Sequence, residues 1–209
     1  MPAIRFHDTD RKLSAALRAL SDSLPPGKVS LRHLLEAMGE QGLLMLCALL
    51  TLPFMIPLSI PGVSTVFGVA ILSIGVGVTL NRVPWMPERI LERPLTTDSL
   101  KQAFEKGFRV VARFEHVVRP RWLWVTSTGA IRFTHGLGLI LAALLLMLPF
   151  GLVPFSNTLP ALAALLIALG LLERDGLFVV AGHAVNVAAI VYFGFLIAGA
   201  IAAGHGVFG

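Results

Sequence analysis

The sequence predicts an all-α integral membrane protein built around two helical hairpins. Two long stretches carry no charged side chain: 41 residues separate Glu40 from Arg82, and 40 separate Arg132 from Glu173. The chain is 56% hydrophobic and 14% charged, with a mean hydropathy of +0.80, outside the range of ordinary soluble domains. A straight helix of 40 residues would be about 60 Å long, twice the hydrocarbon thickness of a bilayer. Each stretch is therefore expected to fold back on itself, either spanning the membrane or re-entering it.

The first 40 residues are expected to form amphipathic helices in the cytoplasm. They mix acidic and basic side chains and contain no apolar run of the length that a signal peptide needs. Apolar residues recur at helical spacing from Leu13 to Leu24. Ser30 can cap a short helix that runs through Met38. The first hairpin is expected to follow, over residues 41–81.

Prolines interrupt both hairpins at matching places. The first hairpin contains Leu52-Pro53-Phe54, and the second, residues 133–172, contains Leu148-Pro149-Phe150. This similarity indicates an internal repeat. Interrupted apolar segments at corresponding places in two halves are typical of broken helices that line a buried site. The expected helix breaks are Pro53, Pro57, Pro61, Pro149, Pro154 and Pro160.

The basic residues predict the topology. Residues 1–40 hold six of the 17 Lys and Arg residues and residues 82–132 hold ten. Loops rich in Lys and Arg stay in the cytoplasm, so we expect a multi-pass protein of the bacterial inner membrane with a cytoplasmic N-terminus. Within residues 98–118, apolar and basic residues occupy different helical faces, which predicts an interfacial helix that binds anionic headgroups. Because the charges flank membrane segments, nucleic-acid binding is not expected.

The last apolar stretch, residues 177–203, is long enough for one tilted transmembrane helix. Small residues recur along it at every fourth position, at Gly194, Ala198 and Ala202. This spacing permits close helix packing, either within the chain or across a homodimer. The sequence leaves both arrangements open.

Polar residues near the proline breaks are candidates for substrate binding. Unwound backbone at membrane depth must be buried in protein or line a wet cavity, and hydroxyl and amide side chains can satisfy it. The alternative is a pair of plain turns at the far membrane face, with Ser64 and Asn157 as helix caps. His183 and Asn186 share one face of the last helix and either line the same interior or bond between helices. The candidates are Ser59, Ser64, Thr65, Ser156, Asn157, Thr158, His183 and Asn186.

Glu173, Arg174 and Asp175 form a second candidate site, a gate or charge site between two apolar helices. The alternative is an interfacial loop in which Gly176 permits the turn and Asp175 caps the next helix. His135 and Arg132, at the start of the second hairpin, are interpreted as membrane-interface residues.

No catalytic set is visible in the sequence. There is no nucleophile beside a base, no pair of acids in a membrane segment and no histidine spacing typical of a metal site. The single Cys47 lies in an apolar run and is interpreted as a core or lipid-facing residue. No catalytic residues, metal or cofactor are therefore expected.

Four motifs together resemble the exopolysaccharide synthesis ExoD family: PGVSTVFG at 61–68, PWMP at 84–87, PFSNTLP at 154–160 and GLLERDG at 170–176. The resemblance runs from about residue 30 to residue 200, and its most specific part is the Glu-Arg-Asp-Gly that follows an apolar helix. It implies a bacterial integral membrane protein linked to exopolysaccharide production. It carries over no reaction and no catalytic residues.

Three functions are compatible with these patterns. The favoured one is a transport-like or lipid-handling protein that supports exopolysaccharide synthesis or export, with a polar pocket at the broken helices. The alternative is a scaffold or regulator that recruits polysaccharide assembly proteins through residues 98–118. The third is an enzyme acting on a lipid-linked sugar, which would need Glu173 or Asp175 close to His183. Membrane lipids and a second copy of the chain are the other expected partners.

Overall fold

The computed structural model describes residues 27–55, 63–81, 94–96, 120–126, 129–148, 150 and 153–208. Most of these residues are helical, with turns between the helices, and β1 (Lys28–Ser30) pairs with β2 (Pro94–Thr96) in one short antiparallel ribbon. The ribbon is an addition to the expected all-α architecture. The predicted helices before residue 27 and at 98–118 lie outside the described residues, as do Pro57, Ser59, Pro61 and Pro149.

The first hairpin begins earlier than expected. Helix α2 (Leu31–Thr51) is continuous, so the predicted short helix ending at Met38 and the first arm of the hairpin are one element. No proline interrupts this stretch, and isolated glycines weaken a helix without ending it. The helix ends before Pro53, which lies in the 3-10 turn η1 (Leu52–Met55). Helix α3 (Val63–Leu80) forms the returning arm.

The second hairpin consists of α6 (Gly129–Leu146) and α7 (Thr158–Leu172). Pro154 lies in the turns between them. Pro160 does not break a helix, because it is the third residue of α7. A proline is tolerated in the first turn, where its missing N–H would have no helical acceptor.

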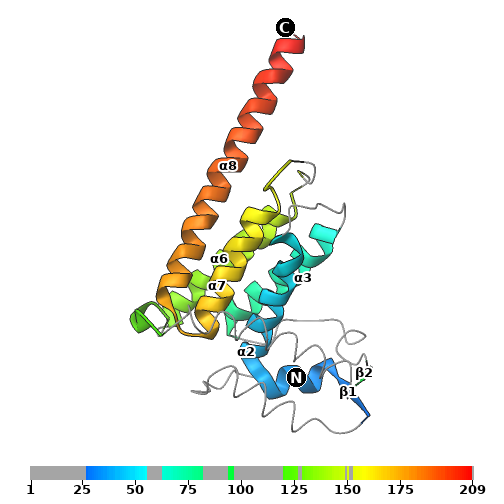
Figure 1. The fold of residues 1–209 in the computed structure, drawn as a ribbon, viewed down its shortest axis with the longest axis vertical. Helices are drawn as coiled ribbons and strands as arrows, with labels where there is room; N and C mark the ends of the chain where they lie inside the picture. Colours follow the sequence, from blue (N-terminus) through cyan, green and yellow to red (C-terminus); the bar gives the residue numbers. More distant parts are fainter. Residues whose placement is uncertain are drawn as a thin grey trace.

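The two hairpins run in the same direction and pack side by side. The end of η1 and the start of α3 lie at the same end of the bundle as the end of α6 and the start of α7, and the open ends lie together at the other (Figure 1). Close contacts at glycines join α3 to α6 in antiparallel order. A Cβ placed on Gly68 would lie 2.4 Å from the Cγ of Met147, and one on Gly75 would lie 3.0 Å from Ile140. These glycines let two apolar helices approach closely.

The last described helix, α8 (Gly176–Phe208), starts at the open end of the bundle and extends beyond the ends of the other helices (Figure 1). Its first half packs on α7, where a Cβ on Gly182 would lie 2.6 Å from the Cγ1 of Ile167. Among the described residues, α8 is the one helix long and apolar enough to cross a membrane, over Gly176–Ala202. Only 17% of its most apolar window is buried, whereas the core helix of a soluble protein would be mostly buried. The four other apolar helices are shorter.

The small residues of α8 do not pack within the chain. A Cβ on Gly194 would meet nothing within 4 Å, and Ala198 and Ala202 are exposed. Of the two arrangements that the spacing permits, packing within the chain is therefore wrong. This face of α8 is open to lipid or to another chain.

Candidate functional site

A pair of hydrogen-bonded histidines joins α6 to α8. The Nδ1 atom of His135 lies 3.0 Å from the Nε2 atom of His183, and the two rings are tilted by 37°. The other nitrogen of His135, Nε2, lies 2.8 Å from the carbonyl oxygen of Val125, at the end of the 3-10 turn η2 (Leu123–Val125). His135 is only 4% exposed, and His183 is half-buried. A three-membered chain of polar groups therefore runs from α8 through α6 to η2.

One turn further along, Asn186 repeats the link between α8 and α6. Its Nδ2 donates to the carbonyl oxygen of Gly138 over 2.9 Å. Its Oδ1 is buried and has no hydrogen-bond partner. The pairs His135–His183 and Gly138–Asn186 have the same sequence separation, so α6 and α8 run parallel and in register.

Gly138 is needed for this approach, because a Cβ there would lie 2.5 Å from the Cε1 atom of His183. The ring of His183 thus lies directly over the backbone of α6. We call this set the polar seam. It consists of His135, Gly138, His183, Asn186 and the carbonyl group of Val125.

The hydrogen-bond pattern fixes the neutral tautomers of the two rings. The Val125 carbonyl can only accept, so the Nε2 atom of His135 carries a hydrogen. In a neutral ring the Nδ1 atom of His135 must then accept, which places the shared hydrogen on the Nε2 atom of His183. The Nδ1 atom of His183 is left as a bare acceptor. The seam therefore holds two acceptors that lack a donor among the described residues, His183 Nδ1 and Asn186 Oδ1.

Three hydroxyl groups elsewhere in the helices bond differently. Thr51, Ser73 and Thr79 each donate to a carbonyl oxygen three or four residues earlier in their own helix, over 2.7 to 2.9 Å. Such bonds satisfy a hydroxyl without joining two helices. The seam is different because its polar side chains connect separate elements.

The Glu173–Gly176 segment forms the turn between α7 and α8. The Oδ1 atom of the fully buried Asp175 accepts from the backbone N–H of Leu177 over 3.0 Å, so it caps α8 as the interfacial-loop interpretation predicts. The left-handed residue in the turn is Arg174, with φ of 54°, rather than Gly176. Gly176 is required for another reason, because a Cβ there would lie 2.8 Å from the carbonyl oxygen of Trp122.

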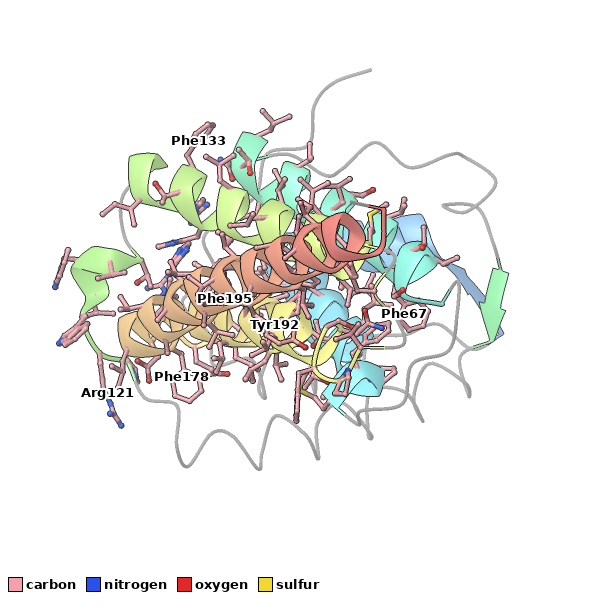
Figure 2. All side chains as sticks on the ribbon, turned by 90° about the horizontal axis from the view of Figure 1, so that it is seen from above. Phe67, Arg121, Phe133, Phe178, Tyr192 and Phe195 are labelled. Atoms are coloured by element: carbon pink, nitrogen blue, oxygen red, sulfur yellow. The ribbon has the colours of Figure 1, made fainter. Side chains whose placement is uncertain are left out.

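Exposed aromatic and basic residues surround this turn. Trp122 is 52% exposed and Trp124 is 69% exposed. The carbonyl of Arg121 accepts from the N–H of Gly176 over 2.8 Å, while its side chain projects away from the bundle (Figure 2). Tryptophan and arginine are the residues expected at the headgroup level of a membrane. The open end of the bundle therefore has the composition of a membrane interface.

The described residues of the second chain reversal, 147–148, 150 and 153–157, bond to one another and to α8. The hydroxyl of Ser156 lies 2.7 Å and 2.8 Å from the carbonyl oxygens of Phe150 and Val153. The hydroxyl of Tyr192 donates to the carbonyl of Pro154 over 2.5 Å, and Figure 2 shows Tyr192 beside this loop. Asn157 is buried at the first position before α7, but its side chain makes no capping hydrogen bond.

The candidate residues therefore fall into separate groups. Ser156 and Asn157 lie buried at the second reversal, with Thr158 half-buried beside them. Ser64 is half-buried and Thr65 exposed at the start of α3. His183 and Asn186 belong to the polar seam, and His183 lies about 13 Å below Tyr192 along α8, at 1.5 Å per residue.

The acid–histidine pair that an enzyme would need is not formed. Asp175 precedes His183 by eight residues of α8, which corresponds to about 12 Å along the helix. His183 bonds to His135 instead.

His135 is interpreted from the sequence as a membrane-interface residue, and in the structure it packs inside the protein. Its ring is buried between α6, α8 and η2. The sequence did contain a signal, since His135 is the one ionisable residue inside its uncharged stretch. Its partner could not be identified without knowing that α6 and α8 are neighbours.

The comparison with known families shows which family the chain belongs to. The model of the family described as "Exopolysaccharide synthesis, ExoD" matches residues 13–195. The chain belongs to the ExoD family. The resemblance seen in the motifs is thereby confirmed, and the family is linked to exopolysaccharide synthesis.

Two relatives extend the comparison. The chain is 48% identical over 204 residues to Protein ExoD from Rhizobium meliloti, a match that covers 98% of this chain and 85% of that protein. It is 28% identical over 155 residues to an uncharacterized protein from Synechocystis sp., covering 74% and 72% of the two chains. No solved structure matches the ExoD fold described here.

Proposed function

We propose that this ExoD protein supports exopolysaccharide synthesis or export from within the inner membrane, in a transport-like or lipid-handling role. In this proposal both hairpins enter the membrane from the cytoplasmic side and return to it, and α8 alone reaches the other side. The breaks between the hairpin arms then lie inside the bilayer, where they bring polar backbone groups to membrane depth.

The main support for re-entrant hairpins is the hydrogen bond from Tyr192 to Pro154. This bond shows which part of α8 lies beside the second reversal. Tyr192 follows Gly176 by 16 residues, about 24 Å along the helix. The apolar stretch of α8 continues for ten more residues, to Ala202, about 15 Å beyond the reversal. If Gly176 lies at the headgroup level with Trp122 and Trp124, the reversal lies short of the far surface.

Exposed side chains beyond Tyr192 support the same placement. Phe195 is 75% exposed and Ile201 is 56% exposed. Large apolar groups in contact with water are unfavourable, at about 25 cal/mol per Å². Lipid chains at this level would cover them. Because the bundle is shorter than α8, the reversals would contact lipid within the bilayer. A molecule with a polar and an apolar part could contact polar backbone and lipid there at the same time.

Topology can be tested with single cysteines. We would place a cysteine at Phe155 in the reversal, at Arg174 in the turn before α8, or at Ile201 near the end of the apolar stretch. All three positions are exposed, whereas the native Cys47 is fully buried. An impermeant maleimide should label the Arg174→Cys variant from the cytoplasmic side only. The Phe155→Cys variant should resist labelling from both sides. Efficient labelling of Phe155→Cys from the periplasm would show spanning hairpins and refute re-entry.

The pocket residues can be tested by complementation of a strain that lacks the gene. The proposal expects Asn157→Ala and Ser64→Ala to abolish exopolysaccharide production while the protein still inserts at normal levels. Ser73→Ala is a matched control, because the Ser73 hydroxyl bonds only within α3. Unchanged production by both pocket variants would contradict a pocket at the breaks.

The scaffold function makes the opposite prediction. It depends on the basic residues of the 98–118 segment, which lies outside the described residues. If the protein is a scaffold, Arg109→Glu combined with Arg113→Glu would abolish exopolysaccharide production. The Asn157→Ala and Ser64→Ala variants would then leave production unchanged.

A further inference from the structure

We propose that the His135–His183 pair is a proton-binding site, in which one proton adds to His183 Nδ1 and is shared between the two rings. This inference concerns the polar seam itself. It does not depend on whether the hairpins re-enter the membrane.

The geometry defines where the proton adds. In the neutral pair both Nε2 atoms carry hydrogens, directed to Val125 O and to His135 Nδ1 respectively. The lone pair of His183 Nδ1 is the remaining basic position on the two rings. His183 is also the more exposed of the two residues, since His135 is 4% exposed.

The step changes only N–H bonds. A proton adds to the Nδ1 lone pair of His183 and forms an imidazolium ring. The hydrogen on its Nε2 atom can then move across the 3.0 Å contact to His135 Nδ1. His183 becomes neutral with its hydrogen on Nδ1, and His135 becomes the imidazolium ring. The Val125 carbonyl accepts from His135 Nε2 in both forms, so the charge is stored on the pair.

The surroundings favour a proton over a larger ligand. The rings bond to each other directly, and Gly138 packs against the Cε1 atom of His183. No group of three or more metal-ligating side chains occurs among the described residues. Asn186, one turn along the same face of α8, supplies a buried carbonyl oxygen without a donor.

The neighbouring ionisable groups leave the pair without a carboxylate partner. Among the described residues, each ring bonds to the other ring or to Val125. The nearest charged residue along α6 is Arg132, which donates to Asn81 Oδ1 over 3.3 Å. Helices α3 and α7 contribute no ionisable side chain within their own bounds. The remaining ionisable residues on the surrounding described elements are Arg121, Glu173, Arg174, Asp175, Tyr192 and His205.

Nitrogen NMR of the protein in lipid nanodiscs tests the proposal. Protein labelled with ¹⁵N-histidine would be titrated between about pH 8 and about pH 5, the range in which imidazole changes charge. At the alkaline end both rings should carry hydrogen on Nε2 alone. On acidification the pair should gain a single N–H, and the signals of both rings should shift together as a coupled titration.

Variants separate the proton site from a structural contact. His135→Phe keeps an aromatic ring but removes the acceptor, so His183 should titrate alone with a changed midpoint. In His183→Phe the buried His135 should lose its titration over the same range. Circular dichroism would check that each variant is folded, and the wild-type titration remains decisive if one is not. Rings that stay neutral throughout the range, with a bound water donating to His183 Nδ1, would overturn the proposal. So would two independent titrations.

Discussion

The two halves of α8 have similar composition and opposite surroundings. In the first half, a Cβ on Gly182 would collide with Ile167, and His183 and Asn186 bond to α6. In the second half, Cβ atoms on Gly194 and Gly199 would meet nothing within 4 Å. Hydropathy is high in both halves, so it indicates a membrane helix without telling which half faces protein. Glycine contacts and polar side chains make that distinction.

The largest expected effect is the difference between two glycines of this helix. In Gly182→Ala the new methyl group would lie 2.6 Å from Ile167 Cγ1 and 2.9 Å from the backbone of α7, which would force the helices apart. We expect a loss of about 1–3 kcal/mol in the free energy of unfolding. Gly194→Ala meets no neighbour and should be neutral or gain up to about 1 kcal/mol in helix propensity. Unfolding by SDS in mixed micelles would measure both.

Equal losses in the two variants would contradict the comparison. They would mean that Gly194 also packs closely, as in a homodimer across the second half of α8. Crosslinking at the exposed Ala198 would then distinguish a dimer contact from misfolding.

The second effect concerns the histidine pair. His183→Leu keeps the helix apolar but leaves the Nδ1 atom of the buried His135 without its donor. Hydrogen bonds between membrane helices contribute about 0.6 kcal/mol on average and up to about 1.7 kcal/mol. We expect a loss near the upper end in the same SDS assay, because His135 stays buried. Val187→Leu, at a position 60% exposed on the same helix, is the control and should change little. An unchanged free energy of unfolding in His183→Leu would show that the histidine pair does not stabilise the contact between α6 and α8.

The sequence predicted the parts of this fold that depend on composition. Uncharged stretches marked the hairpins, Pro53 marked the end of α2, and Asp175 was recognised as a possible cap. Contacts between helices could not be predicted in the same way. The pairing of His135 with His183 depends on α6 and α8 lying parallel in register, and Gly138 matters only because His183 lies over it.

Two predicted features of the helices, the start of the first hairpin and the break at Pro160, are wrong for local reasons. The predicted boundary at residue 41 followed the last charge, Glu40, but Glu, Lys and Arg are good helix formers and do not end a helix. Helix α2 begins ten residues earlier, at Leu31. The break predicted at Pro160 is absent because this proline lies in the first turn of α7, where it is tolerated.

A smaller effect is expected at Asn186. Asn186→Leu removes the hydrogen bond to Gly138 O but also removes the buried acceptor Oδ1 that has no partner. The lost bond is worth about 0.6 kcal/mol on average in membrane proteins, and relief of the unsatisfied oxygen offsets part of it. The free energy of unfolding should therefore fall by less than in His183→Leu. A larger loss than in His183→Leu would indicate that Oδ1 has a donor in the membrane, such as a bound water.

A similarly small effect on stability is expected at the boundary between the two halves, where Tyr192 contacts the reversal. Tyr192→Phe removes one hydrogen bond to Pro154 and keeps the ring beside Phe193, so we expect a loss of about 0.5 kcal/mol. The informative measurement is the labelling of a cysteine at Phe155 in this background. If Tyr192 fixes the level of the loop on α8, its loss should speed maleimide labelling at Phe155 and leave labelling at Arg174 unchanged. Unchanged labelling rates at both positions would show that the position of the loop does not depend on Tyr192. The depth of the loop could then not be inferred from its neighbour on α8.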